Sequence, residues 1–202
     1  MTKNTRRTRW SLVTLSALVL IGASVAFAPR EHAAQVDAAK VRRGRYLVQA
    51  MGCHDCHTPK KMGAHGPEPD FSRALSGHPA DPTLPPPPQL PAGPWIATAS
   101  WDLTAWSGPW GISYPVNLTP DENTGLGIWT EEMFVKAMRT GRHMGASRPI
   151  LPPMPWQSLA GLDDADLQAI YAYLRSLPPI KNRVPEAVIA EPVVADAKPG
   201  RS

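Results

Sequence analysis

The chain has 202 residues, of which 43% are hydrophobic, 7% aromatic and 19% charged. Its formal net charge of +4 comes entirely from the first 28 residues, because four bases and no acid lie there and the remaining residues carry 17 bases and 17 acids. A near-neutral body has no electrostatic footprint for nucleic acid, so we exclude nucleic-acid binding. The remaining length predicts a single domain.

The N-terminus has the order of regions that is typical of a secretory signal. Four bases precede an apolar run over residues 11–28. Small residues before Ala26 and Ala28 offer two cleavage sites, although Pro29 disfavours cleavage at the second. The sequence therefore predicts export of the chain.

The same apolar run is about 18 residues long, close to the lower limit for crossing a bilayer. A retained membrane anchor over residues 10–28 is therefore the alternative to a signal peptide within residues 1–28. Thr14, Ser16 and Ser24 lower the gain from membrane insertion, so we favour cleavage. Both interpretations predict a periplasmic protein, either soluble or tethered to the inner membrane by an uncleaved N-terminal helix.

The first predicted helix of the body covers residues 36–50. Its apolar side chains recur at helical spacing and include Val41, Leu47 and Val48. Gly44 lies in its middle, where glycine lowers helix stability, and this indicates a close backbone contact at that position.

Residues 53–57 read Cys-His-Asp-Cys-His and follow this helix directly. Cys-x-x-Cys-His is the attachment signature of a c-type haem. Cys53 and Cys56 would form thioether bonds to the haem, and His57 would supply the proximal iron ligand. A redox Cys-x-x-Cys does not need the following histidine, and a structural zinc site would need a second set of ligands. We therefore predict one covalently bound haem c and, since no other cysteine exists, no disulfide.

Residues 58–112 are rich in proline, glycine and tryptophan and predict a long loop insertion. Two roles are open for its four tryptophans. They either pack the insertion onto the core and shield a haem edge, or they form an exposed patch that docks a partner. The four are Trp95, Trp101, Trp106 and Trp110.

Two further helices are expected in the C-terminal half. One begins after Thr130, a typical N-cap residue, and ends at Gly141. The last covers residues 163–176, where apolar side chains recur at helical spacing before two prolines end it. Residues 181–202 lack an amphipathic period and predict a flexible tail.

Met154 is the predicted second axial ligand of the iron. Prolines on both sides restrict its backbone and remove competing N–H donors, so the loop can hold the thioether in one place. Methionine is also the commoner partner of histidine on a c-type haem. The alternatives are Met144, a histidine or no protein ligand; the candidate histidines are His143, His65 and His78.

These motifs resemble those of the class I cytochromes c, specifically bacterial haem c domains similar to the cytochrome subunits of periplasmic dehydrogenases. The resemblance spans roughly residues 40–180 and matches least over residues 58–112. Four segments carry it besides the haem motif: residues 44–47, residues 117–121 with 127–130, residues 152–156 and residues 167–179.

The resemblance implies an all-α fold, in which the first and last helices cross beside the haem. Residues 36–180 would form the cytochrome c domain, with the long Pro/Trp-rich loop inserted into it. The resemblance also implies His57 and Met154 as the iron ligands, and Gly44 as the contact point of the crossing against a face with Tyr171 and Leu174. Subunits of this kind often have three haem motifs, so the single motif here favours a stand-alone or accessory carrier.

The predicted function is transfer of single electrons from a periplasmic dehydrogenase or membrane complex to an oxidase or another cytochrome. The protein would bind these redox partners and would not be an enzyme, so we assign no catalytic residue. The neutral, soft sulfur of Met154 would favour Fe(II) over Fe(III).

Two other classes remain open. A haem enzyme acting on peroxide or a sulfur compound would need an open or labile sixth position and a distal acid–base residue, for which His143 is the candidate. A gas sensor would need an open position and an output domain.

Overall fold

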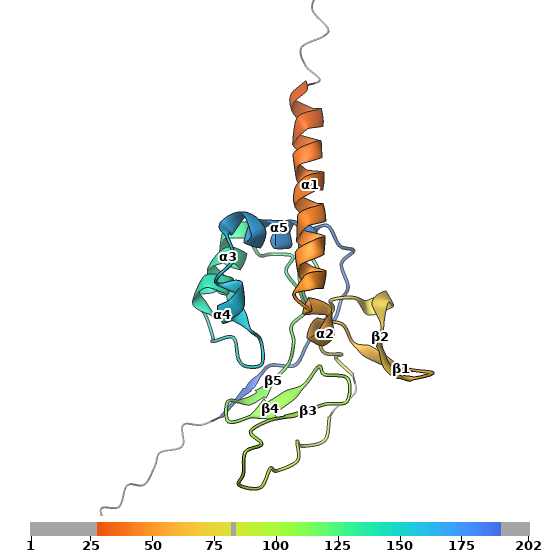
Figure 1. Cartoon of the computed structure of the whole chain (residues 1–202), viewed down its shortest axis with the longest axis vertical. Coiled ribbons are helices and arrows are strands. Elements are labelled where there is room, and N and C mark those ends of the chain that lie inside the picture. Colours follow the sequence, from red (N-terminus) through yellow and green to blue (C-terminus); the bar gives the residue numbers. More distant parts are fainter. Residues whose placement is uncertain (1–27, 82–83, 191–202) are drawn as a thin grey trace, which may run out of the picture. The chain divides into compact units, whose positions relative to one another are not determined.

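The computed structural model describes residues 28–81 and 84–190 of the chain (Figure 1). The chain divides into Met1–Val36 and Asp37–Ser202, and the described part of the first unit is the start of helix α1 (Ala28–Ala50). The predicted leader, except for residue 28, and residues 191–202 of the predicted tail lie outside the described residues. Within residues 28–81 and 84–190, no helix combines the length and apolar character that a membrane span requires.

The helices expected from the sequence are confirmed. Helix α1 ends at Ala50 as expected but begins at Ala28, eight residues before the predicted start at residue 36. Helix α3 spans Glu131–Thr140 and α5 spans Asp164–Arg175. Thr130 caps α3, since its hydroxyl accepts a hydrogen bond from the backbone N–H of Met133 at 3.2 Å, and Gly141 ends the helix with a left-handed φ of 63°. The shorter helical elements are α2 (Cys53–His57), α4 (Trp156–Leu159) and the 3₁₀ turns η1 (Phe71–Arg73) and η2 (His143–Gly145).

The prediction of an all-α fold is wrong, because the described residues also form two antiparallel sheets. One pairs β1 (Lys60–Gly63) with β2 (Gly66–Pro69). The other has the order β3-β4-β5-β6, with bounds Thr98–Ala99, Trp106–Gly108, Gly111–Ser113 and Val188–Ile189. The C-terminal strand β6, blue in Figure 1, lies along β5.

The sheets were not predicted because the strands are very short and because one strand comes from a distant part of the chain. Each strand has two to four residues, which is too short for an alternating pattern to be recognised in the sequence. Most lie in the predicted loop insertion, while β6 comes from the predicted tail and pairs with β5 across a large sequence separation. The fold is therefore mixed, with helices packed around the core and small sheets in the insertion.

Helices α1 and α5 cross at Gly44, as the family resemblance implied. A Cβ atom at Gly44 would overlap the backbone carbonyl of Ala169 and would lie 2.8 Å from Cβ of Tyr173. The face that Gly44 contacts is therefore formed by Ala169 and Tyr173, and the expected partners Tyr171 and Leu174 are wrong. Both residues of the observed face are on α5, so the absence of a side chain at Gly44 permits the close approach of the two helices.

The hydrophobic core lies between α1, α3 and α5 and the segment that precedes α3. Three half-buried residues near the predicted site, Cys53, Met144 and Met154, pack against it. Its buried members include Leu47, Val48, Leu126, Trp129, Phe134, Ala137, Met138, Leu159, Leu167, Ile170, Tyr173 and Leu174. The haem motif and both candidate methionines therefore adjoin one core.

Residues 180–189, which we call the C-terminal strap, follow α5 and end in β6. Asn182 anchors the strap, since its side chain is buried and donates hydrogen bonds to the backbone carbonyls of Ser76 (2.7 Å) and His78 (2.8 Å). The side-chain oxygen Oδ1 of Asn182 accepts a third hydrogen bond, from the backbone N–H of Ala80 at 2.9 Å. The strap is thus fixed at both ends, at Asn182 and at β6.

Candidate haem site

Helix α2 presents the haem motif on one short turn. It begins after Gly52, whose φ of 67° lies in the left-handed region that favours glycine. A Cβ atom at Gly52 would lie 2.7 Å from Oδ2 of Asp55. Cys53 and Cys56 are both half-buried. This turn places the two thiols and His57 within one helical segment, as the attachment motif requires.

The electrostatics of the two thiols disfavour a redox dithiol. Burial raises the pKa of the Cys53 thiol to about 11, and burial also raises the pKa of Cys56. Reactive redox cysteines instead have a depressed pKa, because the thiolate is the nucleophile. The environment of Cys53 and Cys56 therefore matches that of buried, unreactive thiols.

His57 is buried and has one ring nitrogen already bonded. Its Nδ1 lies 2.8 Å from the backbone carbonyl oxygen of Val116. Because a carbonyl can only accept, Nδ1 carries the proton and Nε2 keeps its lone pair. Burial lowers the pKa of His57 to about 4, so the imidazole is neutral at neutral pH. A neutral imidazole with its second nitrogen held by a carbonyl is the usual form of a metal-binding histidine.

The backbone of residues 75–78 holds His57 and Val116 together. The N–H of Gly77 donates to the carbonyl of His57 at 2.8 Å, and the N–H of His78 donates to the carbonyl of Pro115 at 2.9 Å. On the other side, the N–H of Leu118 donates to the carbonyl of Leu75 at 2.9 Å. This small network fixes the carbonyl that orients the imidazole, although its residues lie far apart in the sequence.

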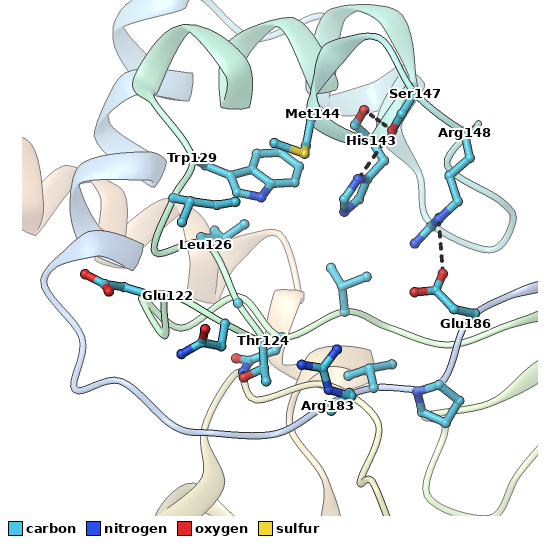
Figure 2. A pocket seen from close by; sticks show the side chains of 17 residues that line it. Glu122, Thr124, Leu126, Trp129, His143, Met144, Ser147, Arg148, Arg183 and Glu186 are labelled. Atoms are coloured by element: carbon cyan, nitrogen blue, oxygen red, sulfur yellow. Dashed lines mark hydrogen bonds and ion pairs between the residues drawn. The ribbon is translucent and has the colours of Figure 1, made fainter.

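A cavity of about 750 Å³ lies beside this network (Figure 2). Its wall comes from the segment before α3, from η2 and the residues that follow it, and from the C-terminal strap. The apolar and aromatic residues of the wall are Val116, Leu126, Ile128, Trp129, Met144, Val184 and Pro185. The ionisable residues that line it are Glu122, His143, Arg148, Arg183 and Glu186.

These residues fit a haem. The volume lies within the range of roughly 300–1,000 Å³ that is usual for cofactor sites, and much of the wall is apolar. Val116 belongs to the wall and its carbonyl accepts the bond from His57, so the cavity and the haem motif share one backbone segment. Cys53, Cys56 and His57 are not among the residues that line the cavity, and the link to it is the Val116 carbonyl. A haem bound there would reach the haem motif, where Cys53 and Cys56 would hold it through thioether bonds and His57 through Nε2.

The structure distinguishes the two candidate methionines by position. Met154 is half-buried, and the loop before it is held by a hydrogen bond from the Ser113 hydroxyl to the carbonyl of Pro152 at 2.5 Å. Met144 lies in η2 with a left-handed φ of 53° and lines the cavity, as Figure 2 shows. The cavity-lining residues thus include Met144 and not Met154.

The three candidate histidines lie in different environments. His143 lines the cavity and packs edge-on against Trp129, with ring centroids 4.9 Å apart. His78 is buried beneath the site, where its Nδ1 lies 2.8 Å from Oγ1 of Thr104. His65 is exposed in the turn between β1 and β2. Of the three, only His143 adjoins the cavity.

The four tryptophans of the insertion divide into two pairs. Trp95 and Trp101 are exposed, at 78% and 56% of their full accessible surface. Trp106 and Trp110 are half-buried in or beside the four-stranded sheet, and the Trp106 indole N–H donates to the carbonyl of Leu103 at 2.9 Å. Packing in the sheet thus accounts for Trp106 and Trp110, whereas Trp95 and Trp101 are exposed, as the partner-docking hypothesis requires.

Sequence reasoning missed several residues of the site. The carbonyl of Val116 has no side-chain signal at all. Arg183 and Glu186 lie in the part of the chain that was predicted to be a flexible tail. A signal for them was present, since Asn182 and Pro185 are residue types that favour fixed turns over free chain.

Comparison with known proteins gives one family match. The sequence model of the family described as Cytochrome c matches residues 41–178. This range contains the haem motif, α3, both candidate methionines and α5, and it ends before the C-terminal strap.

Several curated proteins are similar to the chain. The cytochrome c subunit of a quinone-dependent alcohol dehydrogenase from Gluconobacter oxydans is 29% identical over 181 residues, covering 88% of this chain and 29% of that protein. The cytochrome c subunit of gluconate 2-dehydrogenase from Pantoea cypripedii is 30% identical over 139 residues, covering 69% and 23%. The cytochrome subunit of fructose dehydrogenase from Gluconobacter japonicus is 28% identical over 160 residues, covering 79% and 26%. The chain spans less than a third of the length of each of these relatives.

Proposed function

The chain belongs to the cytochrome c family, and on this premise we propose that it is a periplasmic carrier of single electrons with one haem c. Covalent attachment of haem c and electron transfer are properties of the family. The observation that carries the finer proposal is the hydrogen bond from His57 Nδ1 to the Val116 carbonyl at the wall of the cavity. It supports a neutral imidazole whose Nε2 keeps its lone pair, on a residue bonded to the cavity wall through Val116.

Each residue of the proposed site has a separate task. Cys53 and Cys56 tether the macrocycle, so the cofactor cannot dissociate. The carbonyl of Val116 fixes the orientation and tautomer of His57 and raises its basicity toward a metal. The bound haem supplies a one-electron couple between Fe(II) and Fe(III). The apolar wall around Trp129 excludes water from the site and so favours the less charged, reduced state.

Met154 is the sulfur ligand that we propose for the sixth position. Three prolines border it, and the Ser113 hydrogen bond holds the loop, so little ordering is required for binding. A saturated iron with histidine and methionine ligands suits electron transfer, because its geometry changes little with oxidation state. Met144 is the competing ligand, since its side chain already lines the cavity.

The redox partners and the location are part of the same proposal. The relatives are named as subunits of dehydrogenases, and we infer that a periplasmic dehydrogenase donates electrons to this chain. The chain would pass them to an oxidase or another cytochrome. The predicted leader would export it as a signal peptide or, uncleaved, tether it to the inner membrane over residues 10–28.

One observation favours a second candidate function, a haem enzyme with an open sixth position. His143 is half-buried in the cavity wall, and burial lowers its pKa, so its neutral ring could serve as a distal acid–base group. Such an enzyme would act on peroxide or a sulfur compound. It would require an iron that no methionine occupies.

The M154A variant tests the ligand assignment. We expect it to keep the covalent haem, to lose the near-infrared sulfur-to-iron absorption band of the oxidised protein, and to bind carbon monoxide readily when reduced. M144A is the matched control, and it should keep the band and resist carbon monoxide. If the two variants exchange these behaviours, Met144 is the ligand and the assignment of Met154 is wrong.

The number of haems is tested by mass spectrometry of the denatured protein. One Cys-x-x-Cys-His motif predicts the mass of the chain plus one haem. The variant C53A/C56A should have the mass of the chain alone. A wild-type chain without haem, after expression with a working attachment system, would contradict the proposal.

A further inference from the structure

The C-terminal strap forms one side of the cavity. Arg183, Val184, Pro185 and Glu186 of the strap line it, between the anchor at Asn182 and strand β6. The strap begins after residue 178, where the match to the family ends. This side of the cavity is therefore a feature of this chain that the family match does not account for.

Two guanidinium groups lie on the same side of the cavity, one from Arg183 on the strap and one from Arg148 after η2. Arg148 follows η2, and its Nε lies 3.9 Å from Oε2 of Glu186. Figure 2 shows these two side chains facing each other, with Arg183 on the neighbouring part of the strap and Glu122 at the far side of the cavity. Among the described residues, the guanidinium of Arg183 has no hydrogen-bonded or ion-pair partner.

On this side of the cavity two guanidinium groups face one carboxylate, that of Glu186, because Glu122 lies at the far side. The Arg148–Glu186 pair is long for a hydrogen bond, and Glu186 is almost fully exposed, so it binds Arg148 weakly. A haem brings two carboxylate groups on its propionate side chains. Desolvation of a carboxylate at the edge of an apolar cavity costs free energy unless a donor forms a hydrogen bond with it. A guanidinium group can form two parallel hydrogen bonds with one carboxylate.

We propose that Arg148 and Arg183 bind the haem propionates, and that the Glu186 carboxylate competes with the propionates for Arg148. This inference rests on the proposed placement of haem in the cavity. The two arginines act as positioning residues, because they fix one edge of the macrocycle from the strap and from the η2 loop. Their positive charge also favours Fe(II), the state with one positive charge fewer, and so raises the reduction potential.

The test is an equilibrium redox titration of the purified, haem-loaded variants. R183Q and R148Q should each shift the Fe(III)/Fe(II) ratio toward Fe(III) by roughly tenfold, a factor that a unit charge acting near the protein surface at an effective dielectric constant of about 20 can supply. For a one-electron couple this is a fall of about 59 mV. R183K keeps the charge and should retain most of the wild-type potential. E186Q should raise the potential.

K181Q is the matched control, because Lys181 is an exposed cation two residues before Arg183 that does not line the cavity. Its potential should change less than about twofold in the oxidised-to-reduced ratio, and salt should abolish that change. Equal shifts in K181Q and R183Q would overturn the inference. So would an R183Q potential equal to that of the wild type.

The mass and the absorption spectrum of each variant separate this inference from the proposed function. If the wild type carries no covalent haem, the proposed function fails, and the inference fails with it. If every variant carries one haem with an unchanged axial-ligand spectrum, and only the predicted potential shifts are missing, the proposed function stands and the assignment of Arg148 and Arg183 is wrong.

Discussion

Replacing Asn182 with alanine should destabilise the protein strongly, because this side chain fixes the strap to the body. The substitution removes three hydrogen bonds of 2.7–2.9 Å, to the carbonyls of Ser76 and His78 and from the N–H of Ala80. Each buried polar group left without a partner costs roughly 1–3 kcal/mol. The carbonyls of Ser76 and His78 are buried, whereas Ala80 is exposed. We therefore expect the two carbonyls to lower the free energy of unfolding by about 2–6 kcal/mol, a large share of the roughly 5–15 kcal/mol typical of a domain.

Denaturant unfolding followed by far-ultraviolet circular dichroism measures this loss. The same change should lower the Tm by several degrees, at about 2–4 °C per kcal/mol for a chain of this size. N182D keeps the acceptor for Ala80 and loses both amide donors, so its stability should also fall markedly. N123A is the matched control, because Asn123 is exposed, and its effect should stay within about 0.5 kcal/mol.

A loss below about 1 kcal/mol in N182A would refute this reasoning. It would mean that water or a shift of the strap replaces all three bonds at little cost. In that case the strap would not be a fixed wall of the cavity. Arg183 and Glu186 would then not be held beside the cavity, since Asn182 is the anchor immediately before them.

Two further predictions concern the crossing of α1 and α5. G44A should lower the free energy of unfolding by at least about 1–3 kcal/mol in denaturant titrations, because its Cβ overlaps the Ala169 carbonyl. G93A should be near neutral, because its Cβ would make only an ordinary contact, 3.9 Å from the Pro91 carbonyl oxygen. The hydrogen bond from Arg43 lowers the pKa of Asp166. The ionised Asp166 therefore stabilises the fold at pH values above the ordinary pKa of an aspartate, and this stabilisation is lost as the pH falls through the lowered pKa of Asp166. D166N should be less stable than wild type near pH 7 and equal to it near pH 2, and an unchanged difference would contradict the pairing.

The helices could be predicted from the sequence because their signals are local. Thr130 and Gly141 mark the two ends of α3 by their own capping and backbone preferences. Gly44 likewise indicated a close backbone contact, since glycine in a helix has a local cost that indicates a reason for its presence, while the crossing with the last helix came from the family resemblance. The exact face it meets depends on the rotation of α5 against α1, and the prediction of Tyr171 and Leu174 was wrong for that reason.

The sheets and much of the site could not be predicted, because they depend on contacts between distant segments. Strand β6 pairs with β5 from the predicted tail, and no pattern within two residues can specify such a partner. The haem motif is local and could be identified directly. The Val116 carbonyl that orients His57 is a backbone group, and any residue type at that position would provide it.

The position of Arg183 could not be predicted from local sequence either. Its charge is visible in the sequence, but its value to the cavity depends on Asn182, whose partners lie more than a hundred residues earlier in the chain. A segment without amphipathic periodicity predicts a free tail when only local patterns are considered. Side-chain hydrogen bonds to distant backbone groups make residues 180–189 part of the fold instead.

The absorption spectrum of the purified wild-type protein is the decisive measurement for the proposed haem site, because it reports the haem and both of its axial ligands. We predict a low-spin haem c with a sulfur-to-iron band in the oxidised protein and no spectral change when carbon monoxide is added to the reduced protein. A spectrum without that band, together with rapid binding of carbon monoxide, would contradict the account and favour an enzyme with an open iron.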